Sequence, residues 1–443
     1  MRTTYLLLTY LIVIVTTACT DNDSFTTDRS FRLDFSVDTV KLDTVFSTVG
    51  SSTYTLWAYN RTDDGIRIAS VRLKNGNQTG FRVNVDGSYL DNTTGSVVTD
   101  LEIRRGDSIR VFVELTAPEN HQAEPKMIED QLIFTLESGV AQDVTLKGYA
   151  WDATTLTDLV ISSDTTIQSA RPIVIYGDGI RVDSGAVLNI CNTTLYFHDN
   201  AGMTVNGSLR TDNVIMRGDR LDHMFDYLPY DRVSGQWRGI TLGKSSTGNV
   251  LNDTEIRNAM TALQIDSAAI DSTTRRVVMT RCKIHNSKGY GLLAHHSNIA
   301  LSYCQLSNAL NDCLTLYGGI AYMNRCTIAQ FYPFVGGRGA AFRFSNQGGL
   351  QLTCDSTIIT GYEGDVVMAE RPDTTLHFNY TFANCLLRTP AVENDTVNFR
   401  NIQWESPKDS IQGKMHFVKV DEENLDYDFH LDTLSTAKGK GCY

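Results

Sequence analysis

A strand-like segment returns at a fixed interval in the middle of the chain. Three segments start at Arg281, Tyr303 and Arg325, and in each of them Cys, a branched aliphatic and Asn or Gln occupy alternate positions. Their cysteines are 22 residues apart in both steps. Such alternation places every second side chain on one face of a strand. A strand that returns at a fixed interval is typical of a solenoid with one coil per repeat. We therefore expect a right-handed parallel β-helix.

Stacked coils would align like residues into columns, with neighbouring coils about 4.8 Å apart. Thr254 and Ile256 extend the pattern upstream, and Cys354 and Cys385 would belong to later coils. One inward column would hold the repeated cysteines, Cys282, Cys304 and Cys326. A second column would be an amide ladder at a turn, because Asn tolerates a left-handed backbone and can bond the next coil. Its members would be Asn258, Asn286, Asn308 and Gln330.

The stacked cysteines are interpreted as small buried hydrophobic residues. Side chains in one straight column point in parallel directions, which suits neither the torsion of a disulfide nor a tetrahedral zinc site. Cys313 and Cys442 are not placed by the pattern, and they would either pair with each other or be inert. We expect no cofactor and no resident metal ion.

The first 18 residues have the features of an export signal. Arg2 precedes the apolar run Tyr5–Val15, which is too short to span a bilayer. The segment Thr16-Thr17-Ala18-Cys19 resembles a bacterial lipobox, which implies cleavage before Cys19 and a diacylglycerol on its thiol. Thr16 stands where that pattern usually has Leu. The alternative is a plain signal peptide with Cys19 unmodified.

Residues 19–30 are expected to form a polar tether. The acidic segment Thr20-Asp21-Asn22-Asp23 resembles the tether of surface-displayed lipoproteins of the Bacteroidetes. This resemblance implies a protein anchored by lipid at the outer membrane. It would face either the periplasm or the outside, and the outside is slightly favoured.

Residues 31–152 contain short alternating segments separated by turn signals such as Asp64-Gly65 and Asp86-Gly87. Strands at this spacing are typical of an antiparallel sandwich. The segment Asp107–Val113 and the last strand, which contains Gly148, resemble immunoglobulin-like modules that precede other domains in exported bacterial proteins. We expect an immunoglobulin-like β-sandwich that acts as a spacer or scaffold.

Residues 159–443 are expected to form the β-helix. The segments Ile173–Ile190 and Met203–Leu209 resemble the opening coils of pectate-lyase-like β-helix proteins of the Bacteroidetes, and Gln236–Ile240 resembles their Trp-x-Gly-Ile coil. Phe429–Gly441 resembles their closing segment, with Thr436 in place of a usual Pro. The resemblance implies a fold and says almost nothing about activity, because one fold hosts many functions.

The charge of the chain limits its partners. The formal net charge is −12, which argues against nucleic acid, whose binding needs a basic face. Acidic polysaccharide is disfavoured as well, unless basic residues line a groove. The remaining partners are the membrane, through a lipid anchor, and a polysaccharide or a surface protein.

The resemblance to pectate-lyase-like proteins implies that lyases and hydrolases with this fold act on a polysaccharide lying along one outer sheet. They use either a carboxylate pair or a calcium-binding carboxylate cluster with a nearby base. Tyr290, Asp312, Ala340 and Asp365 are expected in one column, with the two aspartates two coils, or about 9.6 Å, apart. His295 and Arg338 would lie nearby, and calcium is expected only if the protein is a lyase. The alternative is that these aspartates form turns.

The insertion from Asp219 to Trp237 is longer than a turn between coils needs. Long loops on rigid scaffolds often carry function, and aromatic faces suit stacking on sugars. The candidate ligand-binding residues are Phe225, Tyr227, Tyr230 and Trp237. The alternative is that the insertion covers the open side of the early coils.

These observations support three hypotheses of different classes. The first is a surface lipoprotein whose β-helix contacts glycan or another surface partner without catalysis. The second is a polysaccharide lyase or glycoside hydrolase that uses Asp312 and Asp365. The third is a structural or adhesive surface protein. Paired carboxylates in one groove would favour the enzyme, and exposed aromatic residues without such a pair would favour binding.

Overall fold

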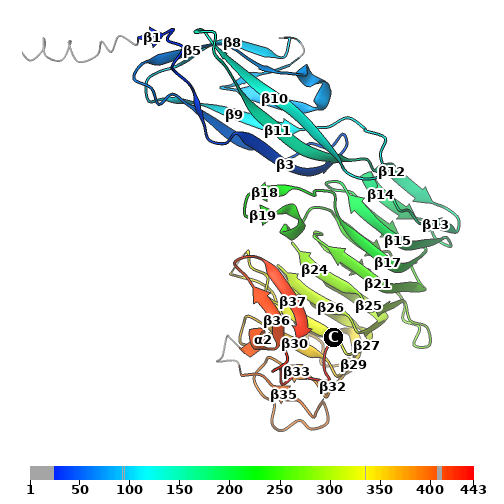
Figure 1. Ribbon diagram of the computed structural model, residues 1–443. Coiled ribbons are helices and arrows are strands. Elements are labelled where there is room, and N and C mark those ends of the chain that lie inside the picture. The colour runs from blue at the N-terminus through cyan, green and yellow to red at the C-terminus, as the bar shows by residue number, and fades with distance from the viewer. Residues whose placement is uncertain (1–23, 92, 94, 335, 407–411) are drawn as a thin grey trace, which may run out of the picture. The chain divides into compact units, whose positions relative to one another are not determined.

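The computed structural model describes residues 24–91, 93, 95–334, 336–406 and 412–443 (Figure 1). Cys19 and the start of the tether lie outside these residues. The chain divides into two compact units, one ending at Trp151 and the other starting at Asp152. In the described residues, no helix is long and apolar enough to cross a bilayer.

The first unit is a β-sandwich of two sheets, which confirms the predicted immunoglobulin-like class. One sheet contains β1 (Phe25–Thr26), β3 (Thr39–Phe46), β5 (Gly65–Leu73), β8 (Val97–Ile103), β10 (Lys126–Leu136) and β11 (Ala141–Trp151). The other contains β2 (Asp34–Phe35), β4 (Tyr54–Tyr59), β6 (Phe81–Val85), β7 (Ser88–Tyr89) and β9 (Ser108–Leu115). Most strand pairs are antiparallel, but β1 with β5 and β3 with β11 are parallel.

The sandwich core follows from the alternation in the strands. In β9, Ile109, Val111, Val113 and Leu115 are buried, while Arg110, between Ile109 and Val111, is exposed. The same alternation in β6 and β10 supplies the facing layers, so the two inner faces form one apolar core. Burial of these apolar side chains between the two sheets stabilises the unit although its strands are short.

The second unit is a parallel β-helix, as predicted. In the part of the unit that the structure describes, 22 strands belong to one sheet system that runs from β12 to β35. The early strands are β12 (Thr154–Ile161), β13 (Thr165–Ile167), β14 (Ile173–Val182), β15 (Val187–Phe197), β16 (Gly202–Val205), β17 (Ser208–Gly218), β20 (Gly239–Leu242) and β21 (Asn249–Arg257). The coil thus begins at Thr154, before the predicted start at Leu159.

The middle coils contain β22 (Leu263–Ile265), β23 (Val277–Thr280), β24 (Lys283–Ser287), β25 (Leu292–Ser302), β26 (Gln305–Ala309), β27 (Leu314–Asn324) and β28 (Thr327–Gln330). The late coils contain β29 (Phe342–Asp355), β30 (Ile358–Gly361), β31 (Val367–Glu370), β32 (Phe378–Ala383), β33 (Leu386–Leu387), β34 (Phe399–Arg400) and β35 (Gln403–Trp404). Their inward side chains form one continuous apolar core along the unit.

The inward aliphatic residues of the repeat stack in a single register. Ile256 pairs with Ile284, and the column continues through Leu306, Ile328, Ile359 and Leu387. Cys282, Cys304, Cys326 and Cys385 stand two positions earlier in their coils. Cys354 lies in a later coil, as expected, but outside the cysteine column, because it pairs with Met323 and Thr357 occupies the column position of that coil. The sequence alignment had placed Cys354 because it is a cysteine, whereas its position in the coil is set by the pairing of its strand with the neighbouring strand.

The cysteines of the described residues are free thiols. Cys282, Cys304 and Cys326 are buried within the apolar core. Burial raises the pKa of the Cys313 thiol to about 12, so that this thiol stays protonated. The hydrogen bond with Cys304 and burial also raise the pKa of the Cys282 thiol, so this column residue is a small neutral side chain.

The turn carrying the amide residues combines backbone strain with side-chain bonds. Asn258, Asn286 and Asn308 have left-handed φ values of 64°, 57° and 53°. The Asn308 carboxamide oxygen accepts from the backbone N–H of Phe331 at 3.1 Å. Gln330 keeps an ordinary φ, and its amide donates to the carbonyls of Ala309 and Asn311. These side chains satisfy backbone groups where the coil bends.

A second turn also contains left-handed residues, which the sequence had not indicated. The residue just before the cysteine column has a φ near +50° in coil after coil: Asn192, Asn213, Asp253, Arg281, Tyr303, Arg325, Ser356, Asn384 and Asn401. Left-handed backbone is costly for residues such as Arg and Tyr. Side-chain amides in adjacent coils also form hydrogen bonds here: the Asn213 amide N–H donates to the side-chain oxygen of Asn192 at 2.9 Å.

Two additions cover part of the outer surface of the coils. The insertion contains β18 (His223–Phe225), β19 (Leu228–Pro229) and the 3₁₀ turn η3 (Tyr230–Arg232). The C-terminal segment contains α2 (Gln412–Met415) and a hairpin of β36 (Phe417–Asp421) and β37 (Asp426–Leu431). This hairpin packs on the late coils through a small apolar core of Ala329, Phe331, Ile358, Leu386, Phe417, Phe429 and Ala437.

Candidate functional site

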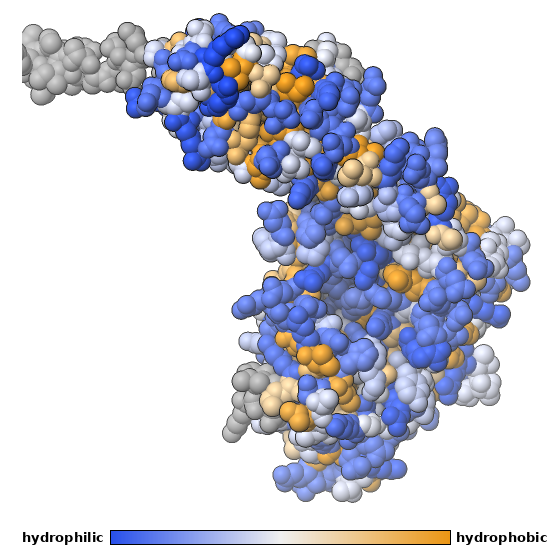
Figure 2. All heavy atoms as spheres, viewed as in Figure 1, coloured by the Kyte–Doolittle hydropathy of each residue, from blue (hydrophilic) through white to orange (hydrophobic). Residues whose placement is uncertain are grey.

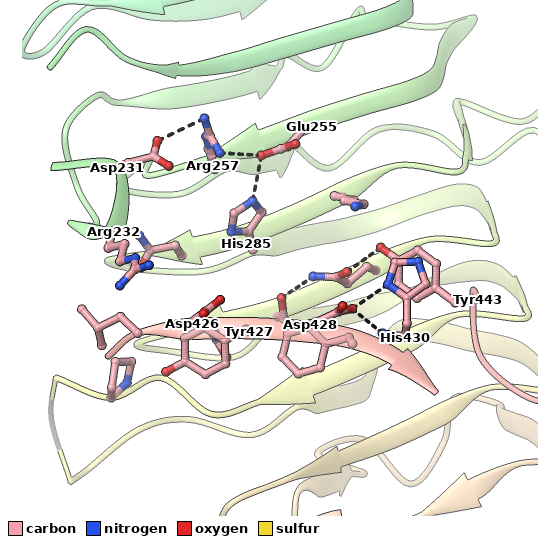
Figure 3. Close-up of a pocket in the computed structure, with 18 of the residues that line it drawn as sticks. Asp231, Arg232, Glu255, Arg257, His285, Asp426, Tyr427, Asp428, His430 and Tyr443 are labelled. Carbon is pink, nitrogen blue, oxygen red and sulfur yellow. Dashed lines mark hydrogen bonds and ion pairs between the residues drawn. The ribbon is translucent and has the colours of Figure 1, made fainter. Parts of the chain in front are cut away.

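A cleft of about 340 Å³ lies between the insertion and the C-terminal hairpin (Figure 3). Its floor is the outer face of β21, β24 and β26, one wall is η3, and the opposite wall is β37 with Tyr443. The surface around it is mainly hydrophilic (Figure 2). Segments that are far apart in the sequence therefore meet at one place on the β-helix.

Strand alternation explains which side chains line the floor. Because Ile256 points into the core, Glu255 and Arg257 on either side of it point outward. The same holds for Lys283 and His285 around Ile284, and for Gln305 and Ser307 around Leu306. The parallel register aligns these outward residues in adjacent coils.

Ion pairs link the floor to the insertion. Asp231 of η3 forms ion pairs with Arg217 at 2.7 Å and with Arg257 at 3.0 Å. Arg257 also contacts Glu255 at 3.0 Å, and Glu255 lies 3.0 Å from the Nε2 atom of His285. The result is a continuous chain of alternating charges from the insertion to the centre of the cleft.

Glu255 is held ionised by this chain. Burial raises its pKa, but the hydrogen bond and electrostatic interaction with His285 and the positive charge of Arg257 outweigh burial and lower the pKa to about 2. Glu255 is therefore a fixed negative group and a hydrogen-bond acceptor at neutral pH.

The wall formed by β37 is both aromatic and charged. Asp428 lies 2.5 Å from the Nδ1 atom of His430. The backbone hydrogen bond from His430, partly offset by burial, lowers the pKa of Asp428. The His430 ring stacks on Tyr443 with centroids 3.9 Å apart, and the Tyr443 hydroxyl donates to Gln305 at 2.7 Å. Burial raises the pKa of Tyr443 and of Tyr427, so both hydroxyls remain protonated.

This arrangement suits binding better than hydrolysis. Cleavage by two carboxylates requires one of them to be protonated, with a raised pKa. Glu255 and Asp428 both have a lowered pKa instead. Within the described ranges, no group of three or more His, Cys, Asp and Glu side chains has the geometry to hold a metal ion.

The aspartates predicted for catalysis lie on another face of the coil. Asp312 and Asp365 each lie two residues before a residue that pairs with Phe342, namely Leu314 and Val367, so the two aspartates stand in coils two steps apart. Asp312 is 4% exposed, and its carboxylate accepts from Thr315, from the backbone of Ala340 and from Arg343. Asp365 accepts from the backbone N–H of Val367 at 3.3 Å. Both carboxylates thus fix turns.

His295 and Arg338 have other neighbours. The His295 ring packs beside Tyr317 with centroids 5.2 Å apart. Arg338 lies over the ring of Tyr362 and 4.0 Å from Glu422, near the C-terminal hairpin. Among the contacts of the described residues, no hydrogen bond or ion pair joins either side chain to Asp312 or Asp365.

The four aromatic residues of the insertion differ in exposure. Trp237 is 1% exposed, stacks on Phe197 at 4.3 Å and donates its indole N–H to Arg257, so the prediction that it contacts a ligand was wrong. Tyr230 lies against the guanidinium of Arg220. Phe225 and Tyr227 are 55% and 79% exposed and stack on each other at 5.6 Å. Only this last pair presents open ring surface.

Of the residues that line the cleft, sequence reasoning had singled out Asn286 and Asn308, as ladder residues, but not its charged and aromatic side chains. Glu255, Arg257 and His285 flank the aliphatic residues of the repeat, so the register itself predicted that they would line one outward face. His430 and Tyr443 carried no such signal. They reach the floor through a contact between the closing segment and coils more than a hundred residues earlier, and the repeat does not encode that contact.

Comparison with known proteins supports the fold. A family model described as "Right handed beta helix region" matches residues 154–334. Solved structures match weakly, and the first two share at most a third of their length with this chain. VesB protease of Vibrio cholerae is 14% identical (TM-score 0.18; 28% of this chain, 33% of that chain). A family 123 glycoside hydrolase from Clostridium perfringens is 8% identical (TM-score 0.18; 28% of this chain, 26% of that chain). PapD-like domain 7 of human CEP192 is 10% identical (TM-score 0.19; 31% of this chain, 92% of that chain). Curated proteins give no match.

Proposed function

We propose that this protein is an exported, lipid-anchored protein of the outer membrane whose β-helix binds glycan in the cleft between η3 and β37, without catalysis. The observation that carries the proposal is the cleft itself. It combines fixed charges and amides with aromatic ring faces, while the carboxylates paired with histidine are held ionised.

The chemistry of the cleft matches what a sugar requires. A sugar offers hydroxyl groups that both donate and accept, and C–H faces that pack on rings. The cleft supplies acceptors in Glu255 and Asp428, and the amide of Asn308 lines it as well. Tyr443 is 39% exposed, so part of its ring is open to a ligand. A few fixed polar groups beside apolar surface are the usual composition of a ligand site.

The insertion offers a second contact outside the cleft. Phe225 and Tyr227 form an exposed stacked pair on the β18–β19 hairpin, just before the η3 wall in the chain. Open ring faces can pack against the C–H faces of sugars. The pair would contact sugar units that extend beyond the cleft.

The proposal is tested with the chain from Thr20 onward on a panel of immobilised glycans. We expect retention on at least one glycan, and loss of most of that retention in Glu255→Gln and His430→Ala. The matched control is Glu102→Gln, because Glu102 is an exposed carboxylate paired with Arg67 in the sandwich. Equal retention of Glu255→Gln and Glu102→Gln would contradict a site in the cleft.

A product assay separates binding from catalysis. The same panel is incubated with the protein, with and without calcium, and reducing ends and unsaturated products are measured. We expect no turnover. Turnover that disappears in Asp312→Asn or Asp365→Asn would instead establish a lyase or hydrolase. Neither turnover nor retention on any glycan would support the structural or adhesive hypothesis, with a protein as ligand.

A further inference from the structure

The η3 wall of the cleft is held rigidly by the β-helix. The buried amide of Asn258 donates to the carbonyls of Tyr230, Asp231 and Val233 at 3.2, 2.8 and 2.9 Å. Arg257 holds the carboxylate of Asp231 from the floor. Three carbonyls bound by one side chain leave this segment little freedom, so the wall is a fixed boundary of the cleft.

The insertion also reaches the C-terminal hairpin and closes one side of the cleft. Arg232 donates to the carbonyl of Asn424 in the turn between β36 and β37. The Asp421 carboxylate holds Asn424 in place, because it accepts from the backbone and side-chain N–H groups of Asn424 at 2.9 and 2.8 Å. Figure 3 shows Arg232 next to the start of β37, at the side away from His430 and Tyr443.

The hairpin closes the cleft along the axis of the coils. Beyond Gln305, the outer face of the same sheet is covered, because the backbone N–H of Cys442 donates to Thr327 and the hairpin core packs on Ala329 and Ile358. A linear polymer lying along the strands' outer face would meet this cover. The remaining side of the cleft lies between Glu255 and Tyr443, where Lys283 is exposed.

We propose that the cleft is blind and takes the end of a glycan chain rather than an interior stretch. This inference rests on the proposed glycan binding and adds the form of the ligand. A chain end enters past Lys283 and stops at the bridge from Arg232 to Asn424. The volume of about 340 Å³ is near the lower limit for small-ligand pockets, roughly 300 Å³, and suits a short terminal segment.

The test uses the polysaccharide that the panel retains, before and after partial hydrolysis to shorter chains. Protein bound at saturation is measured per mass of polysaccharide by calorimetry. If the cleft takes ends, bound protein rises in proportion to the number of chain ends. If it takes interior stretches, bound protein per mass stays the same, and the inference is overturned.

A variant of the closing bridge sharpens the result. Arg232→Ala removes the bridge and is expected to remove the dependence on chain ends, because an interior stretch can then pass through. Arg232→Lys, which keeps a positively charged donor at this position, should keep that dependence. The matched control is Arg275→Ala, an exposed arginine over Tyr322 away from the cleft. Unchanged end dependence in Arg232→Ala would overturn the role of the bridge.

The two proposals fail in different ways. Absence of binding to every probe, with normal thermal denaturation, would overturn glycan binding and this inference together. Binding that ignores the number of chain ends would overturn the blind cleft and leave glycan binding intact.

Discussion

Glu255 shows how single residues set the charge of the cleft. Its side chain is 24% exposed, and its partners hold it ionised far below the pH at which a free glutamate takes up a proton. The ordinary pKa of 4.5 falls to about 2 in the folded protein. A carboxyl whose pKa is lowered by folding stabilises the folded state above its ordinary pKa, and this contribution disappears as pH falls toward the folded value.

The first prediction follows from this linkage. Wild-type protein should lose about 2–3 kcal/mol of stability from Glu255 alone between roughly pH 4.5 and pH 2. In Glu255→Gln this component is absent, so the loss of stability over the same pH interval should be smaller. Urea denaturation at a series of pH values measures it, and identical acid profiles for the two proteins would contradict the assignment.

Two aromatic residues of the insertion should behave in opposite ways. Trp237→Ala removes a buried ring that stacks on Phe197 and should cost about 3–5 kcal/mol of stability. Tyr227→Ala removes an exposed ring and should change stability by less than about 0.5 kcal/mol, while weakening glycan retention. Thermal denaturation and glycan retention of both variants check this. Loss of stability in Tyr227→Ala would show that the ring is structural.

At the scale of elements, the repeat predicted the fold because it constrained the register. Alternation around Ile284 and Leu306, together with the fixed interval, fixed which faces point inward. The same reasoning did not fix the position of Cys354 within its coil, where a longer coil shifted the alignment. The repeat could not predict the cleft, because Arg232, His430 and Tyr443 belong to segments outside the repeat. Local periodicity describes the coils, and only long-range packing describes what covers them.

The amide of Asn258 should control the order of the insertion. Asn258→Ala leaves the carbonyls of Tyr230, Asp231 and Val233 without this donor and should cost about 1–3 kcal/mol. The matched control is Asn286→Ala, which has the same left-handed backbone and lies one coil further along. Limited proteolysis between Asp219 and Trp237 should be faster in the first variant only. Equal cleavage of both would mean that backbone strain, not the amide, matters.

At the scale of the whole molecule, the proposed lipid anchor would link the cleft to a membrane surface. We expect Cys19→Ala to move the protein from the membrane fraction to the soluble fraction, because a lipidated cysteine is the proposed attachment to the bilayer. Fractionation of cells with an antibody against the sandwich measures this. Retention of the variant in washed membranes would contradict anchoring through Cys19.

The left-handed turns before the cysteine column have a consequence for how the chain folds. Arg281, Tyr303 and Arg325 each hold a backbone conformation that costs a residue of this kind about 1–2 kcal/mol. An isolated coil gains too little to offset that strain, whereas a coil laid on a finished neighbour gains a full row of hydrogen bonds and apolar contacts. Assembly should therefore resemble the growth of a crystal, with a slow first layer and rapid addition at the exposed edge.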